Sequence, residues 1–158
     1  MKRFAVLAIA AAVVLPFTAR AQSKADFSGT WTLNAEKSDP PPQGRGGGGG
    51  MAGAPVTIKQ TGSMLTIDSQ GRGGPVTMNY KLDGSESTNQ VQGRGGATEA
   101  KSKAHWDGAK LVIETTREVG GNTVTTTETR SLSADGREMT VETSFNGNTR
   151  KTVYTKGM

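Results

Sequence analysis

Apolar and polar residues alternate with a period of two in several stretches of the chain, which is typical of strands with one buried face. The clearest stretches are residues 64–68, 76–82, 111–114 and 139–145. Residues 123–129 are rich in threonine, whose branched Cβ also favours a strand. The apolar positions of the four alternating stretches are the predicted core: Leu65, Ile67, Val76, Met78, Tyr80, Leu82, Leu111, Ile113, Met139, Val141 and Phe145.

Short turn sequences separate these stretches, and no stretch beyond the first 21 residues has a helical period. The turns are Asp83-Gly84, Asp107-Gly108, Gly120-Gly121-Asn122, Asp135-Gly136 and Asn146-Gly147-Asn148. Strands joined in sequence by tight turns predict an all-β, antiparallel, up-and-down meander. Such a meander closes into a barrel of eight or nine strands, because closure removes the edges of the sheet. A two-sheet β-sandwich is the alternative.

The first 21 residues have the features of a cleaved signal peptide. Lys2 and Arg3 precede an apolar run over residues 4–17, and Ala19-Arg20-Ala21 matches the small-x-small cleavage pattern. The run is shorter than the roughly 20 residues that span a bilayer, so no transmembrane segment is expected after processing. We therefore expect a periplasmic or secreted protein with one domain over residues 22–158.

Composition narrows the classes of partner. Loss of the three bases in residues 1–21 lowers the formal charge from +5 to +2, which gives no reason to expect nucleic acid as a partner. The chain has no cysteine, so neither a disulfide nor a lipid-modified cysteine is available.

Two Gly-containing segments interrupt the strand pattern. Residues 39–55 are rich in Pro and Gly and predict a flexible loop, and residues 86–97 predict a second, polar loop. The string Gln-Gly-Arg-Gly-Gly occurs three times, around Arg45, Arg72 and Arg94, each time between predicted strands. We interpret the strings as soluble loops, because they lack the aromatic residues that stack on bases. The alternative partner for these arginines is an anionic polymer of the cell envelope.

The two ends of the domain resemble the calycin group, which includes lipocalins and intracellular lipid-binding proteins. Gly29 and Trp31 match the Gly-x-Trp element of the family's first strand, and Arg150 matches the arginine of its last strand that lies across that Trp. The resemblance implies a barrel closed by Gly29, Trp31 and Arg150. A guanidinium over the indole would gain cation–π energy.

Two departures from the family bear on ligand binding. Lipid-binding proteins hold a fatty-acid carboxylate with an arginine two residues before a tyrosine of the last strand, and here Thr152 stands two residues before Tyr154. Their two-helix lid is replaced by the Pro/Gly-rich residues 39–55. We therefore do not expect the family's own way of holding a carboxylate.

The aromatic residues are the candidate ligand-binding residues. Trp31, Tyr80, Trp106 and Tyr154 would line an apolar pocket, and the alternative is that they fill the barrel core. The strand before Trp106 would face inward with three small residues, which favours a cavity: Ala100, Ser102 and Ala104.

Candidate catalytic chemistry is scarce. His105 is the only histidine and is expected to point outward beside a turn. The chain has no cysteine nucleophile, no Gly-x-Ser-x-Gly elbow, no phosphate-binding loop and no clustered metal ligands, so we expect neither an enzyme nor a metal or cofactor protein. The sequence favours an exported lipocalin-like protein that binds a small, mostly apolar ligand. The alternative is a non-enzymatic structural or interaction protein of the envelope with a filled core.

Overall fold

The computed structural model describes residues 23–40, 54–71, 73–93 and 96–157, which form strands and turns but no helix. No helix able to span a membrane occurs in this described part. The predicted signal peptide and most of the predicted loop at residues 39–55 lie outside it. The strands are β1 (Gly29–Asn34), β2 (Val56–Gln60), β3 (Met64–Gly71), β4 (Gly74–Lys81), β5 (Glu86–Gly93), β6 (Gly96–Asp107), β7 (Lys110–Val119), β8 (Asn122–Leu132), β9 (Glu138–Phe145) and β10 (Asn148–Lys156).

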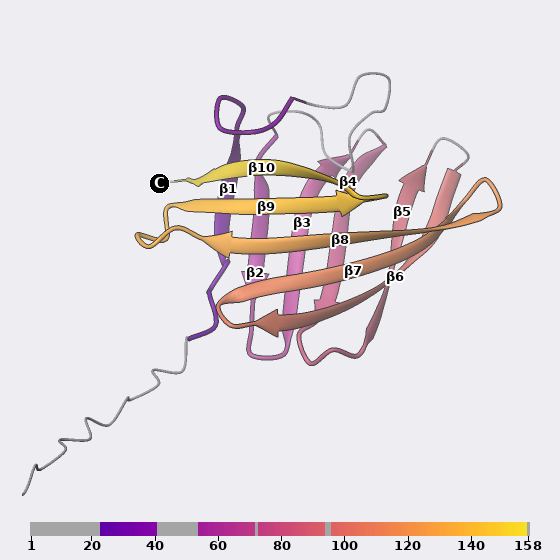
Figure 1. The fold of residues 1–158 in the computed structure, drawn as a ribbon, viewed down its shortest axis with the longest axis horizontal. Coiled ribbons are helices and arrows are strands. Elements are labelled where there is room, and N and C mark those ends of the chain that lie inside the picture. Colours follow the sequence, from indigo (N-terminus) through magenta and orange to yellow (C-terminus); the bar gives the residue numbers. More distant parts are fainter. Residues whose placement is uncertain (1–22, 41–53, 72, 94–95, 158) are drawn as a thin grey trace, which may run out of the picture.

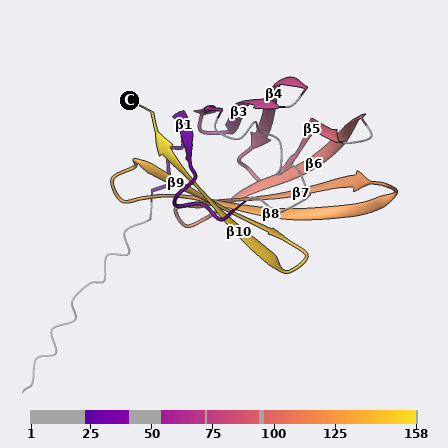
Figure 2. The ribbon, with the colours of Figure 1, turned by 90° about the horizontal axis from the view of Figure 1, so that it is seen from above.

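All ten strands form one antiparallel sheet with the order β4-β3-β2-β1-β10-β9-β8-β7-β6-β5. The first and last strands pair directly, with Trp31 opposite Lys156. The sheet curls into a nearly closed barrel, as the two ribbon views show (Figures 1 and 2). The predicted all-β meander is confirmed, with ten strands in place of eight or nine.

The seam between β4 and β5 is held by side chains instead of a strand ladder. The backbone N–H of Asn79 donates to Asn89 Oδ1 at 2.8 Å, and Asn89 Nδ2 donates to the Asn79 carbonyl at 2.9 Å. The Lys81 N–H donates to Ser87 Oγ at 2.8 Å. Asn89 and Ser87 are buried, so these bonds satisfy edge groups that would otherwise be left unpaired.

The core lies toward one end of the barrel. We call the end with the β2–β3, β4–β5, β6–β7 and β8–β9 turns the core end, and the opposite end the loop end (Figure 1). Of the predicted core residues, Val76, Met78 and Phe145 are half-buried and the others are buried. The largest buried side chains lie mostly in the core-end half: Phe27, Trp31, Ile58, Leu65, Leu111, Ile113 and Met139.

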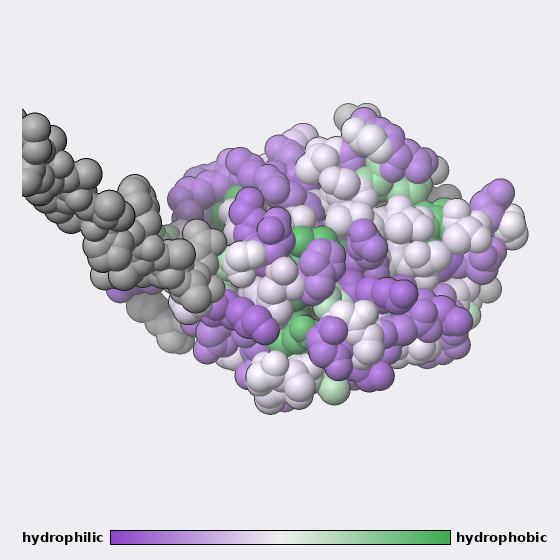
Figure 3. Space-filling model, turned by 60° about the horizontal axis from the view of Figure 1, so that its bottom comes forward, coloured by the Kyte–Doolittle hydropathy of each residue, from purple (hydrophilic) through white to green (hydrophobic). Residues whose placement is uncertain are grey.

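The outer surface is mainly hydrophilic. Figure 3 shows apolar residues only as small patches among hydrophilic ones on the face that it views. Among the described residues, the large apolar side chains that are exposed are Met64 and Val119. This face therefore offers no broad apolar surface to a partner.

Candidate functional site

Trp31 closes the floor of the barrel at the core end. Its indole is fully buried and donates from Nε1 to the Phe27 carbonyl at 2.8 Å. The Lys156 ammonium lies over the ring, 5.3 Å from its centroid, where the π face attracts a cation. Gly29 makes room for this lysine, because a Cβ at that position would lie 2.7 Å from Lys156 Cε. Gly29 also has a φ of +134°, which disfavours any side chain.

Arg150 does not lie over Trp31, so this part of the predicted closure is wrong. Arg150 pairs in register with Thr143. It lies six residues before Lys156 on β10 and therefore closer to the loop end. Its Nη2 donates to the Asp39 carbonyl at 3.3 Å. Lys156 occupies the position over Trp31 that was predicted for Arg150, because Lys156 is the basic residue of β10 that pairs with Trp31.

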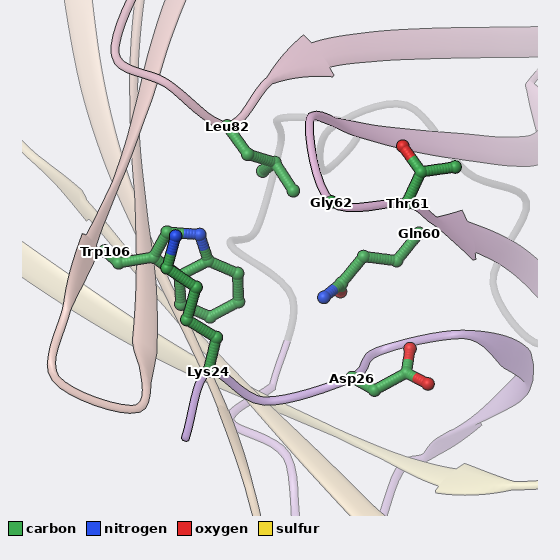
Figure 4. A pocket seen from close by; sticks show the side chains of 7 residues that line it. All are labelled: Lys24, Asp26, Gln60, Thr61, Gly62, Leu82 and Trp106. Atoms are coloured by element: carbon green, nitrogen blue, oxygen red, sulfur yellow. The ribbon is translucent and has the colours of Figure 1, made fainter. Parts of the chain in front are cut away.

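Trp106 lines a cavity of about 270 Å³ at the core end (Figure 4). Phe27 stacks on its ring with centroids 6.1 Å apart and planes 13° apart, and the Lys24 ammonium lies 5.6 Å from the ring centroid. The N-terminal segment, the end of β2, two turns and the end of β6 contribute the lining residues: Lys24, Asp26, Gln60, Thr61, Gly62, Leu82 and Trp106.

A buried ion pair lies inside the barrel on β8. Arg130 is 8% exposed; its Nε donates to Glu128 Oε1 at 2.6 Å, and its Nη2 forms an ion pair with the same oxygen at 2.5 Å. Its Nη1 contacts Met139 Sδ at 3.7 Å. Burial is the largest effect on the guanidinium and disfavours its charged form, but the Glu128 carboxylate together with Tyr80 and Tyr154 more than offsets it, so the pKa of Arg130 is raised. Arg130 therefore stays charged, with its counter-charge beside it.

Tyr80 on β4 and Tyr154 on β10 lie in the field of this ion pair. Burial, reinforced by the charge of Glu128, raises the pKa of Tyr80 to about 12. Burial also raises the pKa of Tyr154, against the opposing charge of Arg130. Both phenols therefore remain neutral around pH 7 and can donate hydrogen bonds.

The four predicted ligand-binding residues thus do not line one pocket. Trp31 is packed in the floor, Trp106 lines the core-end cavity, and Tyr80 and Tyr154 lie near the ion pair. Their roles in ligand binding stay a prediction.

The predicted orientations on β6 agree with the structure. Ala100, Ser102 and Ala104 are buried, and His105 is exposed. No cluster of three or more potential metal ligands occurs within the described ranges.

The sequence prediction missed Glu128 and Arg130. They lie two residues apart and so share a face of β8, and strand pairing places Arg130 opposite the buried residues Leu111 and Val141. A signal for both residues is present in the sequence. If the alternation of the Thr-rich stretch is continued to residue 130, Glu128 and Arg130 fall on the same face of the strand.

A second cavity, of about 420 Å³, lies along the β4–β5 seam. Neutral polar side chains dominate its lining, among them Thr77, Asn79, Asn89, Gln90 and Gln92. It contains no charged side chain and no aromatic one among the described residues.

The fold of the barrel is similar to that of solved structures, although no family model matches its sequence. No protein-family model and no curated protein matches the sequence. The REP1-NXSQ fatty acid transporter superposes with a TM-score of 0.58 at 15% identity, over 83% of this chain and 96% of that chain. The fold is that of a calycin barrel. Human cRBP IV has the same TM-score at 22% identity, over 84% of this chain and 99% of that chain. The predicted calycin resemblance therefore holds for the fold, although the contact of Arg150 with Trp31 that it implied does not form.

Proposed function

We propose that the protein is an exported calycin-type barrel that binds a small, mostly apolar ligand in its interior. The observation that carries the proposal is a set of inward-facing apolar side chains, in the loop-end half, that are only half-buried. A barrel filled by its own side chains would bury them completely. They come from four strands: Val76, Val91, Val124 and Phe145.

Strand pairing supports the inward orientation of these residues. Val124 stands opposite Arg117, and Arg117 stands opposite Ala100, which is fully buried. Residues directly opposite each other share a face of the sheet. Val91 is two residues from the buried Asn89 and so shares its face.

Two further observations support an apolar guest. The named neighbours are a fatty acid transporter and cRBP IV, which are binding and transport proteins rather than enzymes. Within the barrel, the charge of Arg130 is compensated by Glu128, so a guest there would not meet an isolated buried charge.

The test is a titration of the mature chain, residues 22–158, with dodecanol, retinol and the neutral dye Nile red, followed by fluorescence. We expect binding in the micromolar range or weaker, because loop ordering and lost freedom offset the apolar contact. Val91→Glu should weaken binding at least about tenfold, since it places a charge on the inward face. Gln90→Glu, on the exposed face of the same strand, is the matched control.

A flat titration with all three probes, for a protein whose circular dichroism shows it folded, would refute the proposal. It would favour the structural or interaction protein with a filled core. Native mass spectrometry of the protein from its own host is the complementary measurement, because a co-purified guest would identify the ligand directly.

An anionic envelope polymer is the second candidate partner, through Arg45, Arg72 and Arg94. These arginines lie outside the described residues, but β1, β3 and β5 each lead toward one of the three strings and all end at the loop end. We expect retention on a lipopolysaccharide or heparin column that is lost when the three arginines become glutamine. Retention unchanged in that variant would exclude this partner.

Export is tested separately by cell fractionation and N-terminal sequencing. The proposal expects a soluble periplasmic or secreted protein that begins at Gln22. A chain that begins at Met1 in the membrane fraction would refute it.

A further inference from the structure

Three side chains that line the core-end cavity, Gln60, Thr61 and Asp26, each already use an acceptor oxygen in a hydrogen bond to the backbone. Gln60 accepts from the Phe27 N–H at 3.0 Å and donates to the Ala25 carbonyl at 2.8 Å. Thr61 Oγ1 accepts from the Met64 N–H at 3.1 Å. Asp26 Oδ1 accepts from the Ser28 N–H at 2.9 Å.

Two residues that line the same cavity carry donor groups, Trp106 and Lys24. The Trp106 Nε1 atom is buried and has no hydrogen-bond partner among the described residues. Leaving a buried donor without an acceptor costs free energy, so we expect a bound molecule to supply an acceptor for this atom. The Lys24 ammonium lies over the Trp106 ring, and Figure 4 shows the two side chains together on one side of the cavity, with Asp26 on another.

The cavity also has an apolar wall. Leu82 and the Trp106 ring face it, and the stacked Phe27 ring fixes the plane of the indole. Its volume of about 270 Å³ suits a small organic molecule rather than a long lipid chain. The complementary occupant has an apolar body and an acceptor group with negative charge.

We propose that this cavity is a second binding site, for a small carboxylic acid with an apolar or aromatic body. A small turn of the indole lets one carboxylate oxygen accept from Trp106 Nε1, which is buried in the structure, and the Lys24 ammonium compensates the charge. The body packs between Leu82 and the indole. Asp26 repels the carboxylate from the far side and so orients it toward Lys24. The site does not depend on a ligand in the barrel interior.

The test uses phenylacetate, with 2-phenylethylamine as a probe of similar size and opposite charge. In ¹⁵N-labelled protein, phenylacetate should shift the indole N–H resonance of Trp106, and the amine should not. Assignment is direct, because Trp31→Phe removes the other indole signal. The Trp31 indole already donates to a carbonyl and should not shift.

Variants separate the contributions of the charged residues. Lys24→Gln should weaken phenylacetate binding about threefold to tenfold, and Lys24→Arg should largely preserve it. Asp26→Asn should strengthen binding, because it removes the repulsion. Lys59→Gln is the control, since Lys59 is exposed and pairs with Asp68 away from the cavity.

Three outcomes would overturn the proposal. The first is a Trp106 resonance that phenylacetate does not move at millimolar concentration, which would leave a bound water as the acceptor. The second is an equal shift by the amine. The third is displacement of phenylacetate by saturating dodecanol, which would place both probes in the barrel interior. Failure of dodecanol, retinol and Nile red all to bind, with phenylacetate still bound, would refute the proposed barrel function and leave this site intact.

Discussion

Replacing Glu128 by Gln tests whether the interior ion pair is a buried charge that needs its partner. Glu128 Oε1 accepts a hydrogen bond from Arg130 Nε and pairs with Nη2, and a glutamine oxygen could still accept that hydrogen bond. The substitution therefore changes the charge far more than the shape. The guanidinium, 8% exposed, would lose its counter-charge in a place that water barely reaches.

The expected magnitude follows from the burial of the two partners. Removing one partner of a buried pair costs about 3–5 kcal/mol of unfolding free energy. The Glu128 side chain is 29% exposed, so solvent screens part of the charge and we expect about 3 kcal/mol. The double variant Arg130→Met, Glu128→Leu removes both charges at similar volume and should cost less than about 1 kcal/mol.

The assay is urea unfolding followed by far-ultraviolet circular dichroism, with the midpoint and the slope both fitted. Glu142→Gln is the matched control, because Glu142 is an exposed glutamate on the neighbouring strand β9. A Glu128→Gln cost as small as that of the control would show that Arg130 does not need its counter-charge. A double variant as unstable as the single one would show that the loss comes from packing.

Three further predictions address the seam, the phenol and the barrel floor. Asn89→Ala should cost about 1–3 kcal/mol and speed hydrogen exchange in β4, measured against Gln90→Ala, because it leaves backbone groups of the seam unpaired. Unfolding free energy should fall from pH 10 toward pH 12, because Tyr80 ionises near 10 when unfolded but near 12 when folded, and Tyr80→Phe should flatten this fall. Lys156→Met should change the near-ultraviolet tryptophan circular dichroism and Arg150→Met should not, because Lys156 supplies the cation at the ring of the barrel floor. An equal change in both variants would contradict this assignment.

The elements predicted best from the sequence are those in which apolar and polar residues alternate. In β3, β7 and β9 the buried face holds Leu65, Leu111 and Met139, whose large apolar side chains stand out from their polar neighbours. The same alternation correctly predicted His105 outside and Trp106 turned toward the interior. Burial of apolar area decides the strand face, so this much can be read without knowledge of the partner strands.

The ion pair could not be predicted in this way, because alternation alone does not say which face of a polar strand is inside. Glu128 and Arg130 are inward because their register places them opposite Ile113 and Leu111. Which cation covers Trp31 is likewise a matter of register. Arg150 and Lys156 are both basic and both on β10, and only the pairing of β10 with β1 distinguishes them.

The seam between β4 and β5 also could not be predicted from the alternation of apolar and polar residues. Closure was expected because a closed barrel has no edges, and the structure leaves two edges, β4 and β5. The inward positions of β5 include Ser87 and Asn89, whose oxygen and nitrogen atoms bond the backbone of β4. The sequence around Ser87 and Asn89 predicts a loop, because all their neighbours are polar too. That prediction is wrong, because residues 86–93 form β5 with Ser87 and Asn89 on its buried face. Their burial follows from the bonds that they make to another strand, so periodicity alone could not reveal it.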